Sequence, residues 1–194
     1  MKTIFLFILV SSLSFAQVEI SVGYCKPNIP HIKSLNGVYA NCFFETSNKS
    51  NFSLKIGAEF NYQFGNYSEV SKQLGKIYDS DYKIYKYEAD IKLSYEKYFI
   101  TPLFNSALGI ERYNRNVKYS PRIIDLLPLH SLNKNSLFIK FALGIDIKIF
   151  KGINIGTSYD LYFLGYDNSN TLDKYNNAIS NIRESLNLFL LYNL

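Results

Sequence analysis

Apolar and polar residues alternate one by one through much of this chain. In residues 52–64, FSLKIGAEFNYQF, every even-numbered position from Phe52 to Phe64 is apolar or aromatic, and the odd-numbered positions hold polar residues or glycine. Residues 137–149, LFIKFALGIDIKI, repeat the alternation. Successive side chains point to opposite faces of a β-strand but not of a helix. These segments therefore predict strands that have one apolar face and one polar face.

Eight segments of this kind follow one another, and no helical period separates them. They lie at residues 18–25, 37–45, 52–64, 85–95, 102–113, 137–149, 153–163 and 185–194. The connections after the second, fourth and sixth segments are short, whereas those after the first, third, fifth and seventh are long. Short turns therefore lie at one end of the predicted sheet and long loops at the other, an arrangement typical of outer-membrane barrels.

Alternation alone does not say which face of the sheet is outside, because a soluble lipocalin-like barrel shows the same pattern. The apolar face carries more large side chains than the narrow interior of an eight-stranded barrel holds. The polar face includes Gly23, Gly57, Gly109, Gly144 and Gly156, and glycine weakens a strand unless another group approaches closely. Such crowding indicates the inside of a barrel, so we expect the apolar face to be outside. The alternative is a soluble exported barrel that binds an apolar ligand.

Aromatic residues on the apolar face fall near the two ends of the strands, as two interfacial girdles would. Those near the short turns are Phe44, Phe52, Tyr95, Phe104 and Tyr192, and those near the long loops are Tyr24, Tyr62, Phe64, Tyr85, Tyr87 and Phe163. Aromatic residues are also good strand formers. Their placement at both ends nevertheless favours a membrane barrel.

The first 16 residues have the layout of a secretory signal peptide. Lys2 precedes a short apolar stretch at residues 4–10, and the small residues Ser14 and Ala16 precede the expected cleavage site. The apolar stretch is too short to span a bilayer. We therefore expect residues 1–16 to be a cleaved signal peptide and residues 17–194 to form one outer-membrane β-barrel domain.

Composition and charge further narrow the class of protein to which the chain can belong. The chain is 47% hydrophobic, which excludes disorder, yet no later segment has the unbroken apolar run of a membrane helix. The net charge is +5 with basic and acidic residues interspersed, so no nucleic-acid partner is expected.

Cys25 and Cys42 would lie about five residues apart along a hairpin ladder, too far for a disulfide. We expect two free thiols.

The chain ends on an apolar strand, SLNLFLLYNL. Leu186, Leu188, Leu190 and Tyr192 alternate back from the last residue, Leu194. With this ending and the eight-strand pattern, the chain resembles the small eight-stranded outer-membrane barrels of the OmpA/OmpX type, in the porin family of outer-membrane β-barrel proteins. The resemblance covers essentially the whole mature chain.

This resemblance implies an all-β fold, an eight-stranded antiparallel up-and-down transmembrane β-barrel. It also implies that the barrel-assembly machinery reads the C-terminal strand, although Leu194 departs from the family, in which Phe is usual at the last position. A physical argument, independent of the resemblance, also predicts that the barrel is closed. The last strand must pair with the first, because unpaired backbone groups are costly in lipid.

Charged residues gather on the predicted lumen face. The basic ones are Lys55, Lys86, Lys92, Lys140, Lys148 and Arg183, and the acidic ones are Glu19, Glu45, Glu59, Glu88, Asp90, Glu96, Glu111, Asp146 and Asp160. Charges in so narrow a space should be paired, because an isolated buried charge is costly. A selective ion path is one interpretation, and a salt-bridged plug is the other. We favour the plug, because barrels of this strand number are generally filled.

Catalytic and metal-binding residues are scarce. Outer-membrane enzymes of this size that act on lipid A need a His and a Ser placed together. His31 and His130 both fall in long loops, and the adjacent pair His130 and Ser131 lacks the His-x-Ser spacing of the deacylase. Two distant histidines do not make a metal site. We therefore predict no enzyme activity, no cofactor, and no catalytic, cofactor-binding or metal residues.

The third long loop, residues 114–136, is the strongest candidate for a surface contact. Its middle, residues 123–132, is apolar for a solvated loop, and Arg115, Lys118 and Arg122 precede it. The apolar stretch could pack on the barrel rim, or it could bind an extracellular ligand. The basic side chains could meet lipopolysaccharide phosphates.

These features together predict a monomeric outer-membrane barrel with a plugged polar lumen, structural or surface-binding through long extracellular loops. Its expected partners are outer-membrane lipid, lipopolysaccharide and the barrel-assembly machinery. A lipid A-modifying enzyme is a further, weaker alternative.

Overall fold

The structure is a computed structural model, and it describes residues 17–29, 35–49, 51–71, 76–97, 99–119, 132–165 and 182–194. Its strands are β1 (Val18–Asn28), β2 (Asn36–Lys49), β3 (Phe52–Ser71), β4 (Lys76–Tyr95), β5 (Ile100–Tyr119), β6 (Leu132–Phe150), β7 (Ile153–Gly165) and β8 (Ile182–Asn193). Within these residues no helix is long and apolar enough to cross a membrane. The predicted signal peptide, residues 1–16, lies outside the described residues.

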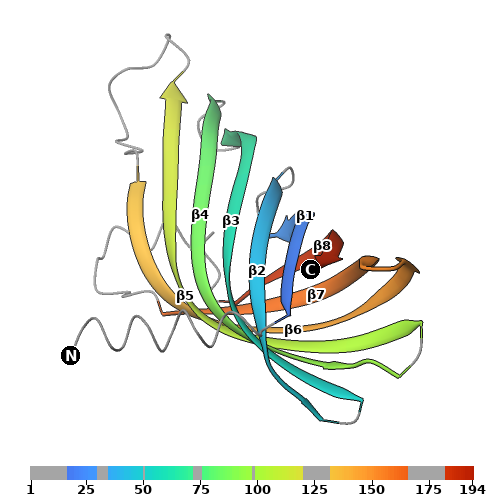
Figure 1. Ribbon diagram of the computed structural model, residues 1–194. Coiled ribbons are helices and arrows are strands. Elements are labelled where there is room, and N and C mark those ends of the chain that lie inside the picture. The colour runs from blue at the N-terminus through green and yellow to red at the C-terminus, as the bar shows by residue number, and fades with distance from the viewer. Residues whose placement is uncertain are drawn as a thin grey trace, which may run out of the picture.

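The eight strands form one closed antiparallel barrel in sequence order (Figure 1). Each strand pairs with the next, and β8 closes the ring by pairing with β1, where Leu190 lies opposite Val22. Closure leaves no unpaired sheet edge. The predicted eight-stranded antiparallel up-and-down barrel and the pairing of the last strand with the first are both confirmed.

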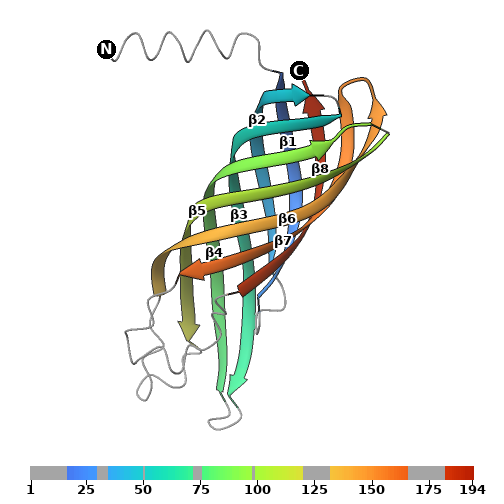
Figure 2. The ribbon, with the colours of Figure 1, turned by 90° about the horizontal axis from the view of Figure 1, so that it is seen from below.

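The two ends of the barrel differ. Figure 2 shows the C-terminus at the same end as the turns that join β2 to β3, β4 to β5 and β6 to β7. The turn between β6 and β7 contains Gly152 at φ 81°, a left-handed conformation that glycine adopts without strain. We call this the short-turn end and the opposite end the loop end.

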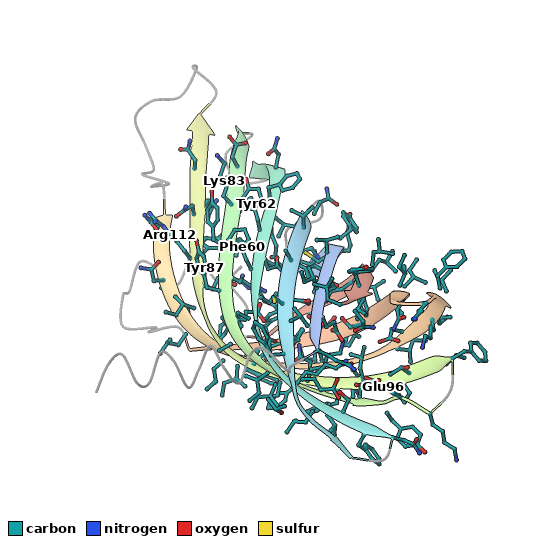
Figure 3. The ribbon with its side chains drawn as sticks, viewed as in Figure 1. Phe60, Tyr62, Lys83, Tyr87, Glu96 and Arg112 are labelled. Atoms are coloured by element: carbon teal, nitrogen blue, oxygen red, sulfur yellow. The ribbon has the colours of Figure 1, made fainter. Side chains whose placement is uncertain are left out.

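Side chains sort between the two faces as the alternation predicts (Figure 3). On β3, Phe52, Ile56 and Phe60 are 42–53% exposed, whereas Lys55 and Glu59 of the same strand are buried inside the barrel. The same outward apolar belt continues on the other strands, for example at Val22, Val38, Ile91, Leu108, Leu143, Ile155 and Leu188. The prediction that the apolar face is outside is confirmed.

The expected aromatic residues lie on the outer face. Near the short-turn end, the rings of Phe52 and Tyr95 lie 4.8 Å apart between centroids. Near the loop end, the rings of Tyr62 and Tyr85 stack at 5.0 Å. Such tyrosines suit a level where one end of the side chain is apolar and the other is wet.

Two predicted loops are shorter than the sequence indicates. The alternation predicts a loop at residues 65–84, but β3 continues to Ser71 and β4 begins at Lys76. It also predicts a loop at residues 114–136, but β5 continues to Tyr119 and β6 begins at Leu132. The ladder of backbone hydrogen bonds needs no apolar face. Pairing therefore continues where apolar and polar residues are mixed on both faces and the sequence alternation has stopped.

Four glycines of the lumen face lie beneath aromatic rings of a neighbouring strand. The pairs are Gly23 with Tyr39, Gly57 with Phe43, Gly109 with Phe138, and Gly156 with Phe189. A Cβ atom added at any of the four would lie less than 3.0 Å from ring atoms. The crowding that the sequence predicts on this face is therefore present, and the rings supply it.

Gly109→Ala is expected to destabilise the barrel by about 1 to 3 kcal/mol, as overpacking of a filled interior does. The added Cβ would meet the Phe138 ring and would lie 2.6 Å from the backbone oxygen of Tyr87. The midpoint of urea unfolding of the purified barrel in micelles measures the change. Gly165→Ala is the matched control, because the atom nearest to its Cβ would be 3.7 Å away. Equal midpoints for the two variants would contradict the packing described here.

The two cysteines are both free. In the register of β1 and β2, Cys25 lies opposite Gly37 and Cys42 lies opposite Ile20, five positions away. Cys25 is fully buried in the lumen, and Cys42 lies on the outer face. The prediction of two free thiols is confirmed.

Candidate functional site: the barrel lumen

The described part of the lumen holds twelve buried charged side chains, and the sequence predicts the inward direction of all of them. The basic ones are Lys55, Lys86, Lys92, Lys140 and Arg183, and the acidic ones are Glu19, Glu59, Glu88, Asp90, Glu111, Asp146 and Asp160. Three further residues expected there lie at the short-turn end. Glu45 is half-buried, while Glu96 and Lys148 are exposed. Lys148 lies opposite Asn154, a buried lumen residue, so it keeps the lumen register although its side chain is exposed at this end.

Lys140 is the centre of the lumen network. Its ammonium group lies 3.3 Å from Glu59 and 3.1 Å from Asp90, and it also forms an ion pair with Glu88. All four side chains are almost completely buried. Asn105 donates a further hydrogen bond of 2.9 Å to the Asp90 carboxylate. One lysine thus holds three carboxylates that come from β3 and β4.

A second ion-pair cluster lies toward the short-turn end. The buried carboxylate of Glu19 on β1 accepts hydrogen bonds from Lys55 on β3, at 2.9 Å, and from Lys92 on β4. Lys55 also reaches Glu96, at 3.1 Å. Because β2 separates β1 from β3 and β4, these ion pairs reach across the lumen rather than between adjacent strands.

Toward the loop end, Arg183 binds a carboxylate and Lys86 lies over an aromatic ring. Arg183 on β8 donates to both carboxylate oxygens of Glu111 on β5, at 2.8 Å each. The ammonium of Lys86 lies 3.1 Å from the ring centroid of Tyr162, and the Phe138 ring lies beside that of Tyr162. A cation over an aromatic face is stabilised by the electrostatic field of the ring.

An apolar cluster, which we call the apolar layer, lies beyond these charges. Ile29, Leu35, Tyr82, Ile84 and Tyr113 are all buried and pack together. Ile29 and Leu35 come from the ends of the β1–β2 connection, and the other three come from β4 and β5. The described lumen therefore contains an apolar layer at the loop end and ion pairs below it.

A small cavity with a mixed polar and apolar lining remains between the charged layers. Its volume is about 30 Å³, and Ser21, Asn41, Asn105 and Asn187 contribute to its lining together with Glu59 and Lys140. A water molecule needs roughly 10 to 15 Å³ of such volume. The cavity has room for a few waters but not for a lipid-sized ligand, which argues against the soluble ligand-binding alternative.

Three lumen carboxylates are close enough to share a cation. One oxygen each from Glu59, Glu88 and Asp90 lie within 4.8 Å of one another. Because Lys140 pairs with all three, its ammonium already supplies a cation to this group. The arrangement supports an internal ion-pair network rather than a metal or cofactor site.

Several predicted features fall outside the described residues. His31, His130 and Ser131, which bear on the enzyme alternative, belong to this group, as does the apolar stretch at residues 123–131. Arg115, expected in a loop, lies instead on β5, where it donates to Ser80 at 3.4 Å and covers the Tyr82 ring. Lys118 also lies within β5.

The inward aromatic residues are the part of the lumen that sequence reasoning missed. Phe43, Phe138 and Phe189 each lie beside an outward-facing apolar residue in the runs CFFE, SLFI and NLFLL. Two consecutive apolar residues in a strand must face opposite sides. This signal would have placed one ring of each run inside, over a glycine of the neighbouring strand.

Comparisons with known proteins agree on the fold. No protein-family model matches the chain, and no functionally curated protein does. A major outer membrane protein from Thermus thermophilus superposes with a TM-score of 0.66 at 9% identity, covering 91% of this chain and 99% of that one. Neisserial surface protein A gives 0.57 at 11% identity, covering 91% and 96%. Ail, the attachment invasion locus protein of Yersinia pestis, gives 0.56 at 12%, covering 92% and 99%.

At such identities these likenesses establish the fold alone. The chain has the fold of the small outer-membrane β-barrels.

Proposed function

We propose that the protein is an integral outer-membrane β-barrel with a plugged lumen, structural or surface-binding through its loop end. The observation that carries the proposal is the inversion of the two faces, since charged residues are buried inside while large apolar side chains encircle the outside. A soluble monomer rarely exposes contiguous apolar patches larger than a few hundred Å². A closed barrel is also one of only two architectures that leave no unpaired backbone in lipid.

The buried side chains of the lumen support a role that does not depend on transport. The apolar layer around Ile84 and the pairs around Lys140 and Glu19 come from several different strands. Buried apolar constrictions also exclude water from narrow pores. We therefore infer that the barrel conducts little or no current.

The loop end supports a surface role. β3, β4 and β5 are each 20 residues long. A strand of that length spans roughly 50 Å along the barrel axis at a tilt of about 40°, against an apolar band of about 25 Å. These strands therefore extend well beyond the membrane. Binding of an extracellular ligand at residues 114–136, recognition of β8 by the assembly machinery and a monomeric state belong to the proposal as well.

Cell fractionation tests the proposed location. The protein is expected to stay with the outer membrane until detergent extracts it, and to migrate differently on gels with and without boiling because the closed barrel resists unfolding. The same purified sample in a planar bilayer should give no steady conductance. Recovery as a soluble periplasmic protein would refute the membrane barrel, and stable ion-selective channels would refute the plug alone.

A further inference from the structure

The outer face carries charged side chains only above the apolar belt, among the strand residues whose side chains the structure describes. They are Lys26, Asp81, Lys83, Arg112 and Glu184. Three of them form hydrogen bonds with neighbouring side chains. Lys26 donates to Asn36 at 2.9 Å, and Glu184 accepts from Asn28 at 3.2 Å. The Asn66 amide, turned so that its nitrogen faces the acceptor, donates to the Asp81 carboxylate at 3.2 Å.

Lys83 and Arg112 are different, because neither pairs with another described residue. Both are exposed and point away from the lumen. Lys83 lies opposite Asn114 in the β4–β5 register, and Arg112 lies opposite Tyr85. They are thus diagonal neighbours on adjacent strands, with Cα atoms roughly 7 to 8 Å apart. Two such long side chains can reach one anion together.

The pair lies where the outer wall changes from apolar to polar. Tyr87 and Ile110 lie opposite each other one step nearer the belt and are 57% and 52% exposed. Asn114 and Asn116 follow Arg112 on the same face. Figure 3 shows Lys83 and Arg112 on the loop-end part of the wall near Phe60, Tyr62 and Tyr87. In a membrane, this boundary is the level of lipid headgroups.

We propose that Lys83 and Arg112 bind the phosphate of an outer-leaflet lipid, whose acyl chains lie along the apolar belt below. The inference rests on the proposed function, because it needs the barrel to be inserted in a membrane. Arginine forms paired hydrogen bonds with phosphate oxygens, and lysine adds a mobile point charge. The stacked rings of Tyr62 and Tyr85 offer a flat apolar surface beside the cations for the lipid glycerol or sugar.

Native mass spectrometry of the full-length barrel in micelles tests the site with bisphosphorylated lipid A and with the same lipid after removal of both phosphates. Wild type is expected to retain the phosphorylated lipid at least tenfold more strongly. The double variant Lys83→Gln, Arg112→Gln should lose roughly thirty-fold in affinity for that lipid, about fivefold per cation, and should bind the dephosphorylated lipid as wild type does. Lys26→Gln is the matched control and should change neither affinity.

Three outcomes would overturn the site: no preference of wild type for the phosphorylated lipid, an unchanged affinity in the double variant, or an equal loss in Lys26→Gln. Displacement of the lipid by an equal concentration of inorganic phosphate would assign the site to free anions and would also overturn it. The heat-dependent gel shift of each variant reports whether the barrel is folded. A protein that folds and floats with vesicles but shows no preference contradicts this inference and leaves the proposed function standing.

Discussion

Lys140→Met is expected to lower the free energy of unfolding by about 3 to 5 kcal/mol, the usual cost of leaving a buried charge without its partner. Lys140 is the ammonium that Glu59, Glu88 and Asp90 share. Methionine keeps most of the volume, so the variant removes charge rather than packing. Urea unfolding in vesicles, followed by gel mobility because the chain has no Trp, measures the loss.

Two further variants test whether the loss of stability in Lys140→Met comes from the broken ion pairs. Lys151→Met removes an exposed cation at the β6–β7 turn and should change stability by less than about 0.5 kcal/mol. Adding Glu88→Gln and Asp90→Asn to Lys140→Met removes two of the stranded charges and should restore part of the loss, since coupled sites are not additive. An unfolding midpoint for Lys140→Met equal to that of Lys151→Met would show that the network does not stabilise the barrel.

Strand order and the inward and outward faces could be predicted from the sequence, because period two is local and strong. Barrel closure was predicted from the resemblance and from the cost of unpaired backbone groups in lipid. Each of Lys55, Lys92 and Lys140 has its direction fixed by its place between outward apolar neighbours. The burial of charged residues inside the barrel follows from the same alternation. These properties depend on the alternation and not on the register between strands.

The pairing inside the lumen could not be predicted. That Arg183 meets Glu111 and that Lys140 meets three acids depends on the register and stagger of strands far apart in sequence. The apolar layer could not be predicted either. Its residues Tyr82 and Ile84 lie in a stretch where both faces carry apolar and polar residues, so the alternation is lost. There the backbone pairing of β4 continues without a sequence signal.

Leu190→Asp is expected to abolish the folded barrel in cells. Leu190 lies on the closing strand, opposite Val22 of β1 and Ile155 of β7, and all three side chains are about half exposed on the outer face. A carboxylate there would face hydrocarbon, at about 1 to 3 kcal/mol depending on depth. The substitution also changes the strand that we propose the assembly machinery reads. Loss of the heat-dependent gel shift in outer membranes, with the unfolded chain degraded, is the expected readout.

Refolding of the purified Leu190→Asp chain into synthetic vesicles separates the two causes, because no assembly machinery is present there. Exposure of the carboxylate to hydrocarbon should by itself lower the free energy of unfolding by about 1 to 3 kcal/mol. Some folding should therefore still occur in thin bilayers. Asn135→Asp is the matched control, since Asn135 is exposed on the same outer face but opposite Arg112, above the apolar belt; it should assemble normally. Wild-type amounts of folded Leu190→Asp in cells would mean that this face of β8 does not meet lipid, and the apolar belt would then need another partner.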